Sequence, residues 1–156
     1  MEENEKFAAE EEKLPLTGTF HHNVDAKNRL FIPAKHRSIL GQKFIISPSV
    51  RDKSLKVFSL AEWHNYIDPI EKKIDRKYKE RVERFYHSNA ATVTPDAQGR
   101  VVLTPELVAY AGLKDCDAVI IGCGNYSEIW SEENLRIEQE SEDMLELLAV
   151  LEEQGL

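Results

Sequence analysis

The feature that most constrains the fold of this chain is a short phrase that occurs twice. Residues 25–32 read DAKNRLFI and residues 96–103 read DAQGRVVL, which gives an offset of 71 residues (96 minus 25). Both copies follow the pattern D-A-x-[N/G]-R and continue with three apolar residues. Such a repeat indicates two copies of one supersecondary unit. The shared part is a polar turn, and turns are where binding residues are usually displayed.

The likeness continues past the turn. Residues 33–35 (PAK) and 104–106 (TPE) are followed by Gly41 and Gly112, and residues 57–59 (VFS) match 129–131 (IWS) one residue out of register. Each half is therefore predicted to run turn, strand, short helix, strand, strand, helix. A half of roughly 55 residues buries too little surface for an independent core. We expect the halves to pack on each other or on a second subunit.

Local signals predict the elements of each half. Alternating residues at 19–24 are typical of a half-buried strand, and Asn28 and Gly99 both tolerate the positive φ of a hairpin turn. Pro33 and Pro105 suit the first turn of short helices that end at glycines. The apolar runs 44–46 and 118–121 predict buried strands, paired with strands at 55–58 and 127–130.

Two longer amphipathic segments flank the second repeat. Residues 61–86 show helical spacing that is interrupted near Pro69, and residues 132–153 carry an apolar stripe on an acidic helix. The domain organisation expected from these patterns has five parts: an acidic disordered extension (1–16), a first repeat (17–63), a connecting helix (64–88), a second repeat (89–133) and a C-terminal helix (134–156).

Charge is distributed unevenly along the chain. The net charge is −8, but residues 20–100 carry 16 basic and 9 acidic groups, whereas residues 101–156 carry 2 basic and 13 acidic groups. A basic centre between acidic ends indicates a polyanionic partner. A charged, solvent-facing helix at 64–88 would explain part of the excess. The first repeat is still basic without that helix, through Lys27, Arg29, Lys35, Arg37, Lys43, Arg51, Lys53 and Lys56.

Several classes of protein are disfavoured by the same sequence. No apolar run approaches 18 residues, so no membrane span is expected, and the acidic N-terminus is unlike a secretory signal. Cys116 and Cys123 fit neither a zinc motif nor a redox pair. The pair His21-His22 either faces a ligand or is simply solvated, and the second alternative is favoured. We therefore expect no metal site and no cofactor.

The two aspartates of the repeated turn allow an enzymatic alternative. Asp25 and Asp96 could meet across a pseudo-twofold axis as a carboxylate dyad or hold a metal ion between them. Alternatively, each aspartate caps its own turn and contacts the arginine four residues later. No nucleophile, base and oxyanion site accompany them, so no catalytic residue is assigned and the chain is not expected to be an enzyme.

The arginines of the turns favour nucleic-acid binding. Arg29 and Arg100 stand at the base of a protruding turn, with Lys27 or Gln98 two residues earlier. Arginine and lysine contact phosphates or guanine edges, and glutamine can read adenine. A two-stranded ribbon fits the major groove of DNA.

These motifs, together with GNYSEIW at 124–130, resemble the bacterial MraZ family over roughly residues 17–135. The resemblance implies an α+β fold of two tandem swapped-hairpin, SpoVT-AbrB-like β-barrel repeats that form a pseudo-dimer within one chain. It also implies a sequence-specific transcriptional regulator, usually a repressor, that is cytoplasmic and associated with the nucleoid. It further implies ring-shaped homo-oligomers that bind short direct repeats of double-stranded promoter DNA ahead of the division and cell-wall gene cluster.

Carried over to this sequence, the resemblance implies DNA-reading turns at 25–29 and 96–100. Lys27, Arg29 and Arg100 are the main expected contacts and Gln98 a weaker one. The residues expected to structure the turns are Asp25, Asn28, Asp96 and Gly99.

The chain departs from the family pattern at four positions: Asn28 replaces a glycine, His36 an aromatic residue, Thr104 a proline and Val108 an arginine. The last change puts a phosphate contact from the second short helix in doubt. A rival hypothesis from another class is a protein-interaction module whose basic turns bind an acidic partner. The same fold family includes antitoxins whose tails bind a toxin, a role that the C-terminal helix could fill here.

Overall fold

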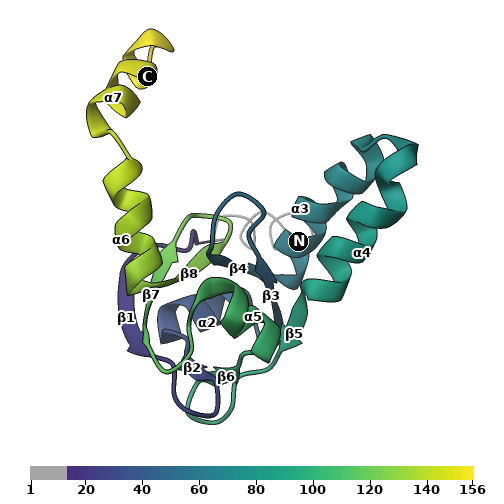
Figure 1. The fold of residues 1–156 in the computed structure, drawn as a ribbon, viewed down its shortest axis with the longest axis vertical. Helices are drawn as coiled ribbons and strands as arrows, with labels where there is room; N and C mark the ends of the chain where they lie inside the picture. Colours follow the sequence, from purple (N-terminus) through teal and green to yellow (C-terminus); the bar gives the residue numbers. More distant parts are fainter. Residues whose placement is uncertain (1–13) are drawn as a thin grey trace, which may run out of the picture.

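The fold is built on one sheet to which both halves of the chain contribute strands. The computed structural model describes residues 14–156 (Figure 1). The first half contains β1 (Thr19–Asn23), β2 (Arg29–Phe31), α2 (Ala34–Leu40), β3 (Phe44–Pro48), β4 (Leu55–Ser59) and α3 (Leu60–Lys73). The single-turn helix η1 (Arg76–Tyr78) and α4 (Lys79–Asn89) lead into the second half, which contains β5 (Ala91–Val93), β6 (Arg100–Val102), α5 (Pro105–Ala111), β7 (Asp117–Gly122) and β8 (Ser127–Ser131). Helices α6 (Glu132–Ser141) and α7 (Met144–Glu153) follow.

The two halves exchange their first strands. The six-stranded sheet has the order β1-β7-β8-β4-β3-β5, so β1 pairs antiparallel with β7 of the second half and β5 pairs antiparallel with β3 of the first half. Strands β4 and β8 pair at the centre, where Lys56 lies opposite Glu128. This exchange explains how two halves of marginal size share one core, as the repeat length predicted.

A second, two-stranded antiparallel sheet joins β2 to β6. The predicted α+β class and the repeated element order are therefore confirmed. The resemblance implied two β-barrel repeats, but no closed barrel is seen within residues 14–156: β1 and β5 are the free edges of the larger sheet and β2–β6 stands apart from it. The exchange of strands merges the two halves into one open sheet.

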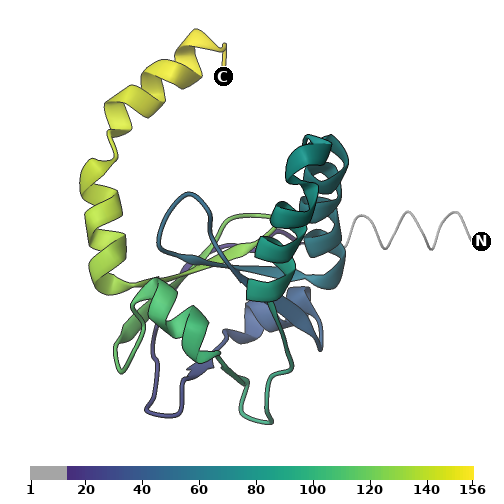
Figure 2. The same ribbon diagram turned by 45° about the vertical axis from the view of Figure 1, so that its right-hand side comes forward.

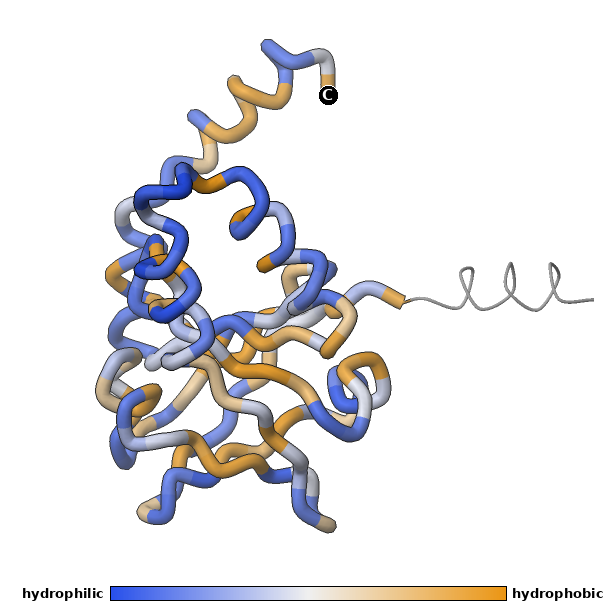
Figure 3. The backbone as a smooth tube through the Cα atoms, turned by 90° about the vertical axis from the view of Figure 1, so that its right-hand side faces the viewer, coloured by the Kyte–Doolittle hydropathy of each residue, from blue (hydrophilic) through white to orange (hydrophobic). Residues whose placement is uncertain are grey.

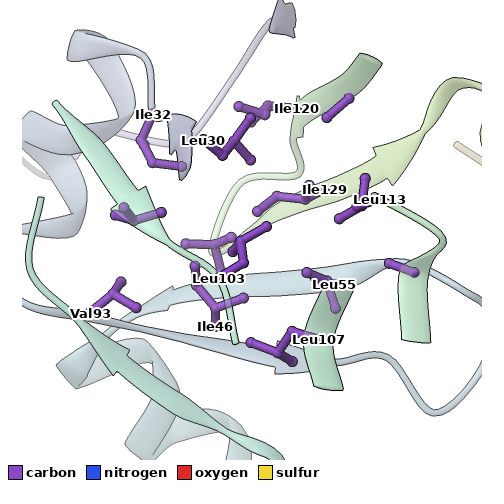
Figure 4. Packing of buried hydrophobic residues seen from close by; sticks show 14 of the residues in the cluster. Leu30, Ile32, Ile46, Leu55, Val93, Leu103, Leu107, Leu113, Ile120 and Ile129 are labelled. Carbon is purple, nitrogen blue, oxygen red and sulfur yellow. The ribbon is translucent and has the colours of Figure 1, made fainter. Parts of the chain in front are cut away.

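The main core lies between the two sheets and is closed by α2 and α5 (Figure 4). Leu30 and Val101 of the small sheet and Ile46 and Ile129 of the large sheet are at most 1% exposed. Leu107, Val108 and Ala111 contribute one face of α5. The apolar alternation of the strands and the helical spacing of α5 thus converge on one hydrophobic cluster, which dominates the stability of the fold.

A second cluster holds the helical hairpin of α3 and α4 against the sheet. It combines Ile45 and Phe58 with Trp63 and Ile67 of α3. The break predicted near Pro69 is wrong: Pro69 lies inside α3, and the chain leaves the helix at Ile74 instead. Packing of the buried face of α3 outweighs the hydrogen bond that a proline removes.

The C-terminal stretch, predicted as one helix, is two. Helix α6 ends at Ser141, and the side chain of Asp143 accepts a hydrogen bond from the backbone N–H of Leu145 to begin α7. Figures 1 and 2 show α7 projecting away from the sheet. Of the extension expected at residues 1–16, residues 1–13 lie outside the described part of the chain. Leu16 is buried and forms a backbone bridge with Gly124.

Candidate nucleic-acid interface

The two repeated turns lie side by side because β2 pairs with β6. Figure 2 shows both turns projecting on the same side of the molecule. The backbone N–H of Ile32 donates to the carbonyl oxygen of Gly99 at 3.0 Å, and the N–H of Leu103 donates to that of Asn28 at 2.8 Å. Each turn is therefore bonded to the strand that leaves the other turn, in a pseudo-twofold arrangement.

The first turn is organised by the carboxylate of Asp25. One carboxylate oxygen accepts from the backbone N–H of Lys27 at 2.9 Å and of Arg29 at 2.8 Å. The other oxygen accepts from Nε of Arg29 at 2.6 Å. One side chain thus orders the turn and orients the arginine.

The second turn repeats this geometry. Asp96 accepts from the backbone N–H groups of Gln98 and Arg100, both at 2.9 Å, and from Nε of Arg100 at 3.0 Å. Because each carboxylate is engaged by its own turn and its own arginine, the arrangement is two turn caps and not a carboxylate dyad.

These hydrogen bonds lower the pKa of both carboxyl groups below the ordinary value of 3.8. The largest cause at Asp25 is the backbone N–H of Arg29, and at Asp96 it is the backbone N–H of Arg100. Hydrogen bonds to the charged form favour that form. Both aspartates are therefore ionised at neutral pH, and both turns keep their caps.

The strand pairing sets which side chains face outward. Leu30 and Val101 lie opposite each other and point into the core, so Arg29 and Arg100 lie on the other face. The register places Arg29 opposite Val102, two residues from Arg100, and such diagonal neighbours have Cα atoms about 7–8 Å apart. Both arginines use Nε for the turn, which leaves the terminal nitrogens of each guanidinium as donors for a ligand.

The tips of the turns carry the other two expected contacts. Lys27 and Gln98 are both exposed. The structure thus brings all four sequence-predicted contact residues to one side of the molecule, on two turns that are bonded together (Figure 2).

Sequence reasoning missed Arg37 as part of this surface. Its Nε donates to the carbonyl oxygen of Ile32 at 2.8 Å, and its guanidinium carbon lies 5.4 Å from the centre of the Phe31 ring. The guanidinium also covers Gly99 of the second turn, where an added Cβ would lie 2.7 Å from Arg37 Cζ. The repeat aligns Arg37 with the buried Val108. This alignment shows that the two halves differ at this position, but it does not reveal that Arg37 contacts the turn of the other half.

Val102 is the second residue that the sequence did not single out. It is 62% exposed on the outward face of β6, opposite Arg29. An apolar side chain between two cationic ones is a surface that can contact the methyl group of thymine.

The remaining candidate residues have structural partners. Buried His36 bonds through its ring nitrogens to the carbonyl oxygen of Thr17 at 2.7 Å and to the hydroxyl of Ser127 at 3.0 Å. Burial raises the pKa of both thiols, that of Cys123 to about 11, so neither is a reactive thiolate at neutral pH. In the described part of the chain, no group of three or more histidine, cysteine, aspartate or glutamate side chains could hold a metal ion. Among the same residues, no helix is both long and apolar enough to span a membrane.

Comparisons with known proteins identify relatives of this chain. The family model described as "MraZ protein, putative antitoxin-like" matches the chain twice, over residues 16–85 and 87–146. The Transcriptional regulator MraZ of Acetivibrio thermocellus is 40% identical over 119 residues, which cover 72% of this chain and 78% of that protein. The protein of the same name from Clostridium tetani is 34% identical over 139 residues, covering 83% of this chain and 96% of the relative. That of Lachnoclostridium phytofermentans is 33% identical over 132 residues, covering 85% and 91%.

Proposed function

The chain belongs to the MraZ family of transcriptional regulators, which is not a family of enzymes, and from this premise we propose that it binds promoter DNA through its two paired turns. The proposed target is a series of short direct repeats ahead of the division and cell-wall gene cluster. The proposed effect is repression. The protein acts in the cytoplasm, associated with the nucleoid.

The pairing of β2 with β6 is the observation that carries this proposal. It presents Arg29 and Arg100 on one outward face, with Lys27 and Gln98 at the adjacent tips. A two-stranded antiparallel ribbon has the size that the major groove admits, and arginine bonds guanine edges or phosphates. One short stretch of duplex can therefore contact both turns of a subunit.

The distribution of charge supports a nucleic-acid partner. Both turns belong to the stretch 20–100, which carries 16 basic and 9 acidic groups. The acidic helices α6 and α7 project on the opposite side of the molecule (Figure 1). A duplex at the turns therefore lies away from the acidic helices, where like-charge repulsion limits binding.

Assembly into a ring of identical subunits completes the proposal. A single subunit offers few phosphate contacts and binds weakly on its own. Subunits joined in a ring engage successive repeats, so that the later contacts form at a high effective concentration. Evenly spaced repeats in the promoter are the matching feature of the DNA.

We also propose that the exchanged strands form a swapped-hairpin, SpoVT-AbrB-like pseudo-dimer. The pairing of β1 with β7 and of β5 with β3 supports this relationship. The units are residues 17–63 and 89–133, joined by helical residues 64–88 and followed by residues 134–156.

Binding of labelled duplexes from the DNA upstream of the gene tests the function. Arg29→Ala and Arg100→Ala should each weaken binding to the repeats by about 5- to 150-fold, the equivalent of roughly 1–3 kcal/mol for a base-reading contact. Arg136→Ala is the matched control, because Arg136 lies on α6 and pairs with Glu133 and Glu140. Unchanged affinity in Arg29→Ala would remove Arg29 from the mechanism.

The description of the matching family as antitoxin-like favours a second candidate, a module that binds an acidic protein. The same purified chain distinguishes the two. If the purified chain binds the DNA upstream of its gene at low salt, the DNA-binding proposal is supported. If it does not bind this DNA, the protein-binding candidate is supported.

A further inference from the structure

Helix α7 carries an apolar face that no other segment within residues 14–156, the described part of the chain, covers. Leu145 is 77% exposed, Met144 66%, Leu147 50% and Leu148 49%, and no residue of the helix is buried. Figure 3 shows the apolar residues concentrated along α7, far from the apolar strands of the core. Contiguous apolar residues left exposed in this way usually mark an interaction site.

The length of α7 strengthens the point. The helix has ten residues, and isolated helices shorter than about 12–15 residues are marginal in water. Met144, Leu147, Leu148 and Leu151 follow the i, i+3, i+4, i+7 spacing of a helix that packs on a neighbouring surface. Helix α7 therefore needs a partner surface of complementary shape.

The negative charge of the C-terminal segment limits the kinds of surface on which α7 can dock. Residues 132–156 carry nine carboxylates and one arginine. An anionic membrane repels such a segment, since membrane-surface helices are rich in lysine and arginine. A second copy of the same helix is also disfavoured, because it brings no positive charge. The partner surface should be apolar and basic.

The hairpin of α3 and α4 offers such a surface. Tyr78, Val82 and Phe85 form one row at i, i+4, i+7, and Tyr78 and Phe85 are 42% and 40% exposed. The adjacent row, one residue earlier in the sequence, is Lys77, Arg81 and Arg84. We call these two rows together the hairpin stripe.

The surroundings of the hairpin stripe fit the same partner. Residues 71–84 carry seven basic and four acidic groups. Phe85 also lines a pocket of about 110 Å³ with Pro48, Leu107 and Tyr110, which has the chemistry to receive an aliphatic side chain. The hairpin stripe is thus complementary to α7 in charge and in polarity.

We propose that α7 of one subunit docks on the hairpin stripe of the next subunit. Figure 1 shows α7 and the α3–α4 hairpin as two arms at opposite ends of the sheet, both on the side away from the turns, so one chain presents both halves of a head-to-tail contact. Such heterologous contacts generate rings when the rotation closes. The inference rests on the ring proposed above and assigns the surfaces that hold it together.

Two full-length variants and a mixture test the contact. The arm variant carries Leu148→Glu and Leu151→Glu, and the hairpin variant carries Arg81→Glu and Phe85→Glu. Light scattering on a sizing column should show an oligomer for the unaltered protein and a mass near the 17.9 kDa chain for each variant alone. An equimolar mixture should give twice that mass, because the intact arm of one variant meets the intact hairpin of the other.

Val50→Glu is the matched control, since Val50 is 49% exposed in the loop between β3 and β4. It should assemble like the unaltered protein. Circular dichroism checks whether each variant is folded. Leu147→Gln with Leu148→Gln provides a milder arm variant that keeps the helix formers and should weaken assembly in the same direction.

Other outcomes overturn the inference in distinguishable ways. A hairpin variant that stays assembled while the arm variant dissociates means that α7 pairs with something other than the hairpin stripe. Assembly retained in both variants places the interface elsewhere and leaves the ring intact. A monomeric unaltered protein removes the ring and this contact together. Binding to a duplex with a single repeat reports on the turns alone and should be the same in the arm variant.

Discussion

At the scale of single residues, the four-residue spacing from aspartate to arginine has a physical explanation. A carboxylate at the first position accepts hydrogen bonds from the backbone N–H groups two and four residues later. It also accepts one from Nε of the arginine four residues later. The turn and the arginine are therefore ordered by one group. Because Nε is already held by the carboxylate, less entropy is lost when the guanidinium makes the proposed contact with DNA.

The first prediction concerns the titration of these aspartates. Since their pKa is lowered from 3.8 in the folded chain, both should titrate below that value when the carboxyl carbons are followed by NMR. Their contribution to stability should be fully present above the unfolded value and should disappear as the pH falls through the folded pKa. A pKa of 3.8 or higher at either residue would contradict the observed caps.

The second prediction concerns Gly99, whose φ is +84°. Gly99→Ala should lower the free energy of unfolding by about 1–2 kcal/mol, the cost of a left-handed backbone with a Cβ, and should displace the Arg37 guanidinium. Asn28→Gly is the control, since residue 28 already has a φ of 60°, and it should change stability by less than about 0.5 kcal/mol. Urea unfolding measures both. Equal stabilities would show that Arg37 and the backbone relax at no cost.

At the scale of elements, the position of the turns depends on the short strands β2 and β6. Each has three residues, and strands this short are held by the core beneath them. Leu30 is fully buried at their centre, whereas Val102 faces outward. The same pair of strands therefore links the core to the proposed DNA surface.

The third prediction separates these two faces. Leu30→Ala should lower the free energy of unfolding by about 2–5 kcal/mol, because it leaves a cavity in the main core. Val102→Ala should change it by less than about 0.5 kcal/mol, because that side chain is 62% exposed. Denaturant titrations of both variants test the assignment of the faces. A larger loss in Val102→Ala would reverse it.

At the scale of the whole molecule, the fold keeps the turns proposed to contact DNA apart from the acidic helices. The basic turns lie on one side of the large sheet and the acidic α6 and α7 project on the other side (Figure 1). The net charge of −8 therefore misrepresents the field that a duplex meets at the turns. Local fields of this kind steer charged ligands.

The fourth prediction follows from that separation. Binding to the promoter repeats should weaken as salt increases, and each phosphate contact adds about 0.9 to the slope of log K against log salt. Lys27→Ala should reduce the slope by about 0.9 if Lys27 meets a phosphate, whereas Gln98→Ala should leave it unchanged because glutamine is neutral. Anisotropy titrations at several salt concentrations measure both slopes. A slope near zero for the unaltered protein would argue against phosphate contacts.

The sequence by itself determined the repeated turns, the short helices after them and most of the strands. These features depend on neighbours in the chain: an aspartate caps the next four residues, and Thr104 caps α5 through the N–H of Leu107. It also pointed to Lys27, Arg29, Gln98 and Arg100 by their place in the turns, and their contact with DNA stays a prediction.

Only the tertiary structure decided how the halves combine. Strands with similar apolar patterns carry no local instruction to pair across halves, so the exchange of β1 and β5 and the open sheet came from the packing of the whole core. Packing also kept Pro69 inside α3, set Arg37 of one half over Gly99 of the other, and left α7 exposed. Each depends on contacts between segments distant in sequence, which periodicity and spacing do not encode.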